Sequence, residues 1–402
     1  MAVEVMTMEL QLDTSKQYAI ALEGGGAKGA YQIGAWRALR EAGIRFCAVA
    51  GTSVGALNGA LMTMGDLEQA EKVWREIRYS KVIDVDDETM KKLLSLDWKE
   101  IDWRGQFEFL KKTLQNGGLD ITPLRQWMEA LVDEDKIRGS DVELFIQTFS
   151  LTDRKELELR AKDLEPGEIA NMLLASAYFP AFKNEALGGK RYADGGLQDV
   201  IPLHVLVEHG YRDIIAIRLF GVGLERAFKI PRYVNVHTVM PNRDLGGTLE
   251  FEAEQSRRNM TVGYFDTMRM LYGLAGTHYY IDRTWSEDQA YTFLVRYLRA
   301  YLKDYDRPCS LLELNEKALP RVRKSLDCHG DYYDLFLCAL EQAAEEAEID
   351  PFQIRTEEEL LEALRGKFGF ETALYPKFLT KALMFRAGFI RSRKLWERRK
   401  EP

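Results

Sequence analysis

The sequence predicts an α/β protein in which a mainly parallel sheet is covered by helices on both faces. Residues 18–22 form a short apolar run that ends in Glu23 and three glycines, as a buried strand does where it enters a tight turn. Residues 29–41 have the apolar spacing of a helix, and residues 46–50 form a second buried strand that a further helix follows. Strands and helices that alternate at this pace are typical of a parallel sheet with helices on each side.

The remaining elements follow the same two patterns. Asp66, with Gln69 three residues later, resembles an N-terminal helix cap and predicts a helix through about residue 77. Beyond about residue 276 the sequence becomes helical and rich in charge, with helices predicted at 338–348 and 356–365. Further strands are predicted at residues 145–151, 156–161, 190–193, 213–220 and 234–239.

The composition limits the class of protein. Apolar residues make up 46% of the 402 residues and charged residues 29%, close to the averages of soluble globular proteins. The net charge of −8 argues against nucleic acid as a partner. The four cysteines have neither metal-binding nor disulfide-framework spacing, and no signal peptide is visible. The uncharged stretch 46–65 has too many small polar residues and glycines for a membrane span, so we expect a cytoplasmic protein.

The segment Gly51-Thr52-Ser53-Val54-Gly55 has the form G-x-S-x-G and lies between a predicted strand and a predicted helix. A sharp strand-to-helix turn needs small flanking residues and holds the serine hydroxyl at the carboxyl edge of the sheet, above the positive end of a helix. The context therefore predicts a nucleophile elbow with Ser53 as the nucleophile. The alternative is an ordinary glycine-rich turn.

A second glycine-rich segment, GGGAKG, begins at residue 24 and also lies between a strand and a helix. A dinucleotide-binding loop would place an acidic residue at the end of the second strand, where residues 48–50 are Ala, Val and Ala. A Walker loop would continue with Lys-Ser or Lys-Thr, whereas Ala30 and Tyr31 follow here. Glycines also allow backbone N–H groups to converge beside the serine, as an oxyanion hole requires. We therefore predict an oxyanion hole formed by Gly24, Gly25, Gly26, Ala27, Lys28 and Gly29.

A nucleophilic serine needs a base, and the sequence offers an aspartate rather than a histidine. Asp194-Gly195-Gly196 follows the predicted strand 190–193 directly and forms a glycine-rich loop at its end. None of the five histidines lies in such a loop, and His204 is expected on a helix as a structural or exposed side chain. We predict Asp194 as the base; the alternative is a simple turn of the kind that Asp-Gly often marks.

Together, these segments resemble the patatin-like phospholipase family. The order strand–GGGAKG–helix, GTSVG and DGG runs from residue 18 to residue 206, about half of the chain. The resemblance implies a three-layer α/β/α sandwich and hydrolysis of acyl esters by a Ser53–Asp194 dyad, with no metal and no organic cofactor. Two positions depart from the family's pattern, since Glu23 stands where Asp is frequent and Val200 where Asn is frequent. Both departures bear on loop support and selectivity.

The resemblance over residues 18–206 and the change to a helical, charge-rich pattern near residue 276 together predict four parts of the chain. They are an N-terminal extension (1–17), a patatin-like catalytic domain (18–206), a continuation of the α/β core (207–275) and a mostly helical C-terminal region (276–402). The expected substrate is a phospholipid, a lysophospholipid or another long-chain acyl ester. The rival hypothesis is a non-catalytic or nucleotide-responsive module whose glycine loop binds phosphate.

Two segments outside these motifs have open alternatives. Residues 97–114, which are rich in aromatic side chains, form either a lid that shelters an acyl chain or an ordinary helical insertion. Residues 376–402 carry nine Lys and Arg against two Glu, and Phe378, Phe385 and Trp396 fall on one helical face. This tail either lies on an anionic membrane surface or packs on the core with its charges in solvent. The oligomeric state is left open.

Overall fold

The computed structural model describes residues 8–84, 87, 118–179, 182–183, 185–304, 306–368 and 383. The predicted lid at 97–114 lies outside these residues, and so does the basic tail 376–402 apart from Leu383. The chain divides into two compact units, Met1–Tyr272 and Gly273–Pro402, and each is described by itself. The four-part division expected from the sequence remains a prediction.

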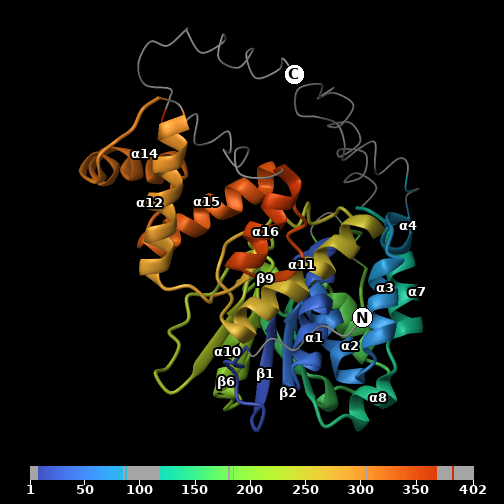
Figure 1. Ribbon diagram of the computed structural model, residues 1–402. Coiled ribbons are helices and arrows are strands. Elements are labelled where there is room, and N and C mark those ends of the chain that lie inside the picture. Colours follow the sequence, from blue (N-terminus) through green and yellow to red (C-terminus); the bar gives the residue numbers. More distant parts are fainter. Residues whose placement is uncertain are drawn as a thin grey trace. The chain divides into compact units, whose positions relative to one another are not determined.

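The first unit is built around one mainly parallel sheet (Figure 1). Its strands lie in the order β4-β3-β2-β1-β6-β7, and β5 also pairs with β3. Strands β3, β2, β1, β6 and β7 are parallel to one another, whereas β4 and β5 run antiparallel to β3. The strands are β1 (Gln17–Leu22), β2 (Arg45–Thr52), β3 (Glu143–Ser150), β4 (Lys155–Arg160), β5 (Tyr192–Asp194), β6 (Asp213–Ile217) and β7 (Asn235–Val239).

Helices cover both faces of this sheet, which confirms the predicted three-layer α/β/α fold. On one face, alanines of β1 and β2 pack against Val205 and Leu206 of α10. On the other face, Leu22 and Val49 lie against Gly59 of α2. Helices α1 and α11 lie side by side and extend this second layer (Figure 1). The helices are α1 (Ala30–Glu41), α2 (Val54–Met64), α3 (Leu67–Arg75), α4 (Tyr79–Val82), α7 (Thr122–Leu131), α8 (Glu134–Gly139), α9 (Ile169–Ser176), α10 (Leu203–Glu208) and α11 (Ala253–Tyr272).

The second unit is mostly helical and encloses an apolar core of its own. The buried carboxylate of Glu341 accepts the N–H groups of Thr277, His278 and Tyr279 at 2.7–2.9 Å, which ties the start of this unit to α15. A short parallel pair joins β8 (Tyr280–Asp282) to β9 (Ile354–Thr356). The helices are α12 (Glu287–Asp304), α13 (Leu311–Glu313), the π-helical turn Leu314–Ala318, α14 (Leu319–Ser325), α15 (Tyr332–Glu346) and α16 (Glu357–Phe368).

Most predicted elements are present, and the shifted ends have physical causes. The strand expected at 213–220 ends at Ile217, because the N–H groups of Leu219 and Gly221 donate to the carboxylate of Glu23 instead of to a strand. The helix expected from residue 338 begins earlier, at Tyr332, behind a capping box. Strands β8 and β9 lack a sequence signal because each is three residues long. No helix of the described chain is both long enough and apolar enough to cross a membrane.

Candidate active site

Ser53 lies on a sharp turn between β2 and α2. Its φ of 55° and ψ of −125° place it in a region that non-glycine residues rarely adopt. The turn closes because its flanks are glycines: a Cβ at Gly51 would lie 2.3 Å from the carbonyl carbon of Gly55, and a Cβ at Gly55 would lie 2.4 Å from the carbonyl oxygen of Leu22. The side chain is thereby held at the carboxyl edge of the sheet, at the start of α2.

The register of the sheet brings Asp194 next to Ser53, although the two residues are far apart in the sequence. Strand β2 ends at Thr52 opposite Gln147 of β3, and the next residue of β3, Thr148, pairs with Asp194 of β5. Because β4 pairs along the other edge of β3, β5 continues the line of β2 beyond its end. The side chain of Ser53 lies near enough to the Asp194 carboxyl group to act on its pKa as a hydrogen-bond donor.

Asp194 is a buried carboxyl group with few partners. Its Oδ1 accepts the N–H of Gly196 at 2.7 Å. Burial raises the pKa of Asp194 to about 6, against the lowering effect of the hydrogen bonds from Ser53 and Gly196. In the described part of the chain no lysine, arginine or histidine pairs with it. A carboxylate without a compensating cation is a stronger base than one in water, and this one points at a serine.

A second serine, Ser176, holds the Ser53 turn in place by hydrogen bonds to the backbone. Ser176, at the end of α9, accepts the backbone N–H of Ser53 at 2.8 Å and donates its own hydroxyl to the carbonyl of Gln147 at 2.6 Å. The hydroxyl of Thr52 donates to the carbonyl of Asp199 at 3.2 Å. The role of Ser176 could not be predicted from the sequence, because a serine within an apolar helix carries no local signal of what its hydroxyl will contact.

The glycine-rich loop contains two backbone N–H groups without an acceptor among the described residues. Of the six residues predicted for the oxyanion hole, Gly24, Ala27 and Lys28 have N–H groups that donate to backbone carbonyls at 2.8–3.3 Å. The N–H groups of Gly25 and Gly26 have no acceptor within the described residues. Both glycines line the cavity into which the serine opens. Two N–H groups without an acceptor, beside a candidate nucleophile, are what an oxyanion would need.

The other members of the loop fix its position. A Cβ at Gly29 would lie 2.5 Å from Cγ2 of Val54, so a glycine is needed for the loop to pack against α2. The Lys28 ammonium donates to the carbonyl of Phe220 at 3.2 Å. Val200 acts through its backbone, because its carbonyl accepts the N–H of Gly24 at 2.9 Å. A valine in place of the family's frequent asparagine preserves that contact.

Glu23 has a structural role at the same edge of the sheet. Its side chain is 1% exposed, and its Oε2 accepts from Nε of Arg218 at 2.7 Å and from the N–H of Leu219 at 2.8 Å. Its Oε1 accepts the N–H of Gly221 at 3.0 Å. Three donors therefore hold the segment that follows β6 against the glycine-rich loop, which agrees with the expectation that this departure concerns loop support.

The cavity beside Ser53 and Asp194 has mostly apolar walls. Asp194 is the one charged side chain among its described lining residues, and Thr248 adds a hydroxyl. The apolar lining comes from several elements of the first unit and includes Leu57, Trp74, Leu124, Met128, Phe182 and Phe251. A cavity of this kind favours an uncharged, hydrocarbon-like part of a ligand over a polar one.

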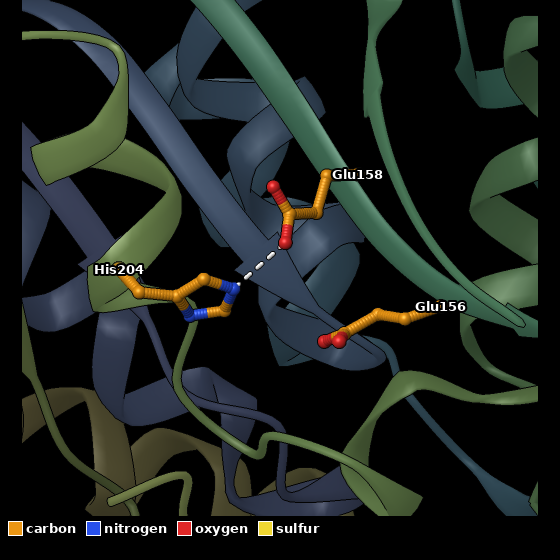
Figure 2. Close-up of side chains that lie close together, drawn as sticks. All are labelled: Glu156, Glu158 and His204. Carbon is orange, nitrogen blue, oxygen red and sulfur yellow. Dashed lines mark hydrogen bonds and ion pairs between the residues drawn. The ribbon is translucent and has the colours of Figure 1, made fainter. Parts of the chain in front are cut away.

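His204, on α10, belongs to a separate charged cluster with Glu156 and Glu158 (Figure 2). Its Nε2 lies 2.8 Å from Oε1 of Glu158, and its Nδ1 lies 2.9 Å from Oδ2 of Asp199. Desolvation lowers the pKa of His204, but the two carboxylates outweigh it and raise the pKa to about 9. Three such side chains can in principle hold a metal, but the Arg226 guanidinium already lies 2.9 Å from the imidazole. We interpret the cluster as an ion network around the buried His204, with Glu158 on its exposed side.

The fold and this edge of the sheet define a class: an α/β protein with a serine on a strand-to-helix turn, a buried aspartate beside it, and no histidine of the described chain bonded to either. The sequence model of the patatin-like phospholipase family matches residues 20–207. Those residues form a domain of the patatin-like phospholipase family.

Named relatives have the same domain within much longer chains. The sequence is 30% identical over 209 residues to a patatin-like phospholipase domain-containing protein of Caenorhabditis elegans, which covers 50% of this chain and 14% of that protein. It is 50% identical over 46 residues to a lysophospholipase of Aspergillus terreus, 11% of this chain and 3% of that protein. Among solved structures, VipD of Legionella pneumophila aligns with a TM-score of 0.41 and 14% identity over 96% of this chain and 98% of that one.

Proposed function

We propose that this protein is a serine acyl-ester hydrolase that acts on lipids, with Ser53 as the nucleophile and Asp194 as the base. The proposal depends mainly on one observation, the contact between the Ser53 side chain and a buried carboxyl group whose pKa is raised to about 6. Membership of residues 20–207 in a phospholipase family supports the same reaction type.

The proposed reaction has two halves. Ser53 Oγ attacks the ester carbonyl carbon while Asp194 takes the hydroxyl proton. The N–H groups of Gly25 and Gly26 stabilise the oxyanion, which is usually the largest single contribution to catalysis in such sites. The C–O bond to the alcohol then breaks, and the alcohol leaves with the proton from Asp194. In the second half, Asp194 takes a proton from water as the water oxygen attacks the acyl-Ser53 carbonyl carbon. The bond from that carbon to Ser53 Oγ then breaks, Asp194 returns the proton to Oγ, and the fatty acid is released.

The cavity supports a long-chain acyl group as the part of the substrate that is bound. Its apolar lining beside Ser53 matches a hydrocarbon chain, whose transfer from water contributes about 0.8 kcal/mol per buried methylene. A phospholipid, a lysophospholipid and a neutral acyl ester all meet this requirement. The alcohol portion of the substrate is to be identified by assay.

The rival function, a module whose glycine loop binds phosphate, has less support. A phosphate-binding loop offers a series of N–H groups to the anion. Here the N–H groups of Gly24, Ala27 and Lys28 donate to backbone carbonyls, and the Lys28 ammonium donates to Phe220. The loop therefore has too few unbonded N–H groups to surround a phosphate. The two that remain, on Gly25 and Gly26, are enough for an oxyanion.

A fluorophosphonate probe tests the proposed function directly. We expect covalent labelling of the wild-type chain at Ser53, identified by peptide mass spectrometry, and none in Ser53→Ala. A panel of phospholipids, lysophospholipids and neutral esters, assayed for released fatty acid, then identifies the substrate. Nucleotide binding without any labelling would favour the phosphate-binding module instead.

A cytoplasmic location and a membrane contact through residues 376–402 remain predictions. Deleting 376–402 and comparing sedimentation with anionic and neutral vesicles at low and high salt tests the contact. Salt-sensitive binding that the deletion removes would support it, and unchanged binding would exclude it.

A further inference from the structure

Four large apolar side chains are exposed around the candidate active site. They belong to the segment after β6 and to the loop after Asp194, and we call them the rim patch: Leu197 (43% exposed), Phe220 (54%), Val222 (71%) and Leu224 (63%). Single exposed apolar residues are common on proteins, but several on adjoining loops beside one cavity indicate a binding surface.

The backbone beneath the rim patch is fastened to both loops of the candidate site. The N–H of Val200 donates to the carbonyl of Leu224 at 2.7 Å, and the N–H of Leu224 donates to the carbonyl of Gly196 at 2.9 Å. A Cβ at Gly221 would lie 2.0 Å from the carbonyl oxygen of Gly24. The backbone of the segment thus contacts the backbones of the glycine-rich loop and of the Asp194 loop. Its exposed side chains therefore have a fixed position relative to the candidate site.

Phe220 is held outward at a conformational cost. Its φ of 47° lies in the left-handed region that non-glycine residues avoid. Three donors to Glu23, from residues on both sides of Phe220, hold the segment in this conformation. More than half of the Phe220 side chain is exposed, although the centre of its ring lies 5.5 Å from Cζ of Arg218.

The rim patch is continuous with the apolar cavity. Val222 lines the cavity that holds Ser53 and Asp194, and the same side chain is 71% exposed. An acyl chain that leaves a lipid layer at the rim patch can therefore reach the cavity along the Val222 side chain.

We propose that the rim patch is the surface through which this protein docks on a lipid layer, with Phe220, Val222 and Leu224 inserted among the acyl chains. The proposal rests on the proposed function, because it assumes that the substrate is drawn from such a layer. It concerns a surface that is separate from the basic tail at residues 376–402.

The test uses the full chain and a matched pair of double variants. Phe220→Asn with Leu224→Ser removes two exposed side chains, and asparagine tolerates the left-handed backbone at position 220. The control, Ile230→Ser with Tyr233→Ser, removes two apolar side chains that are 41% and 64% exposed. They lie in the stretch before β7, at the amino-terminal ends of the parallel strands, whereas the rim patch lies at the carboxyl ends. Sedimentation with phosphatidylcholine vesicles, alone and with phosphatidylglycerol, is measured in the Ser53→Ala background.

We expect the rim variant to bind vesicles at least about tenfold more weakly, since each lost side chain removes apolar area that the lipid would bury. With Ser53 intact, the rim variant should hydrolyse vesicle lipid more slowly by the same factor by which its vesicle binding is weakened. Its hydrolysis of soluble p-nitrophenyl butyrate should change less than about twofold. The control variant should match the wild type in all three measurements. In addition, the emission of Leu224→Trp should shift to shorter wavelength when vesicles are added.

Several results would overturn the proposal. Unchanged vesicle binding in the rim variant would do so, as would an equal loss in the control. A wild-type dimer that the rim variant converts to a monomer, with vesicle binding unchanged, would identify a second copy of this chain as the occupant. Failure of the proposed function gives a different result: no ester is hydrolysed, yet vesicle binding still depends on the rim patch.

Discussion

Glu23 and Asp194 are two buried carboxyl groups at the same edge of one sheet, and their surroundings differ. Glu23 is 1% exposed and accepts from an arginine and two backbone N–H groups. Asp194 is 8% exposed and has one backbone N–H and a serine side chain as partners. Glu23 therefore has three donors, one of them a cation, whereas Asp194 has no cation beside it and lies next to a serine hydroxyl. The comparison shows how partners, rather than burial, separate a structural carboxylate from a candidate base.

The largest effect should follow from removing either member of the candidate dyad. Ser53→Ala and Asp194→Asn should each lower kcat/KM for p-nitrophenyl butyrate by at least about 10³-fold, and the double variant should be no worse than the single ones. Circular dichroism should confirm that each variant is folded. If His204→Asn or His237→Asn alone cost as much, a histidine would be the base and the contrast with Glu23 would lose its meaning.

The next effect concerns stability and belongs to Glu23. Glu23→Gln removes the charge that compensates Arg218 in a buried site, and should lower the free energy of unfolding by about 3–5 kcal/mol. Glu225→Gln is the matched control, because Glu225 pairs with the same arginine at 2.7 Å but is mostly exposed. It should cost less than about 1 kcal/mol in urea unfolding. Equal losses of unfolding free energy in the two variants would mean that the burial of Glu23 does not strengthen its contribution to stability.

Asp194→Asn should have the opposite effect on stability. The folded pKa, about 6, lies above the unfolded value, so the native state binds more protons than the unfolded chain in the interval between them. The carboxyl group therefore contributes stability at low pH that is lost as pH rises through about 6. Removing it should raise the free energy of unfolding by about 1–3 kcal/mol at pH 7, with no gain near pH 4. A loss of stability at both pH values would contradict this assignment.

The smallest effect is a change of rate with pH. Because Asp194 must be ionised to accept the serine proton, kcat/KM for a soluble ester should fall about tenfold per pH unit below about 6. Glu225→Gln should leave this profile unchanged, since that side chain lies outside the candidate dyad. A profile that stays flat down to pH 4 would indicate that the pKa of Asp194 is not raised, and would contradict its assignment as the base.

The sequence alone predicted the local parts of this protein. Glycines at 51 and 55 around Ser53, and glycines after Asp194, are local requirements of tight turns, so the pattern of residues identifies the turns without a structure. The alternation of apolar strands and amphipathic helices likewise predicted the parallel sheet and its two helical layers. The role of Glu23 in loop support could be suspected only from its departure from a family pattern.

The tertiary structure decided what lies next to what. Asp194 reaches Ser53 because β5 pairs with β3 just beyond the end of β2, and no local pattern encodes that register. The support of Ser53 by Ser176 depends on the same long-range packing. Phe220, expected at the end of a strand, is instead an exposed side chain on a strained turn, because Glu23 captures the neighbouring N–H groups. Sequence patterns determine the local conformation, but partners and exposure depend on contacts between segments far apart in the chain.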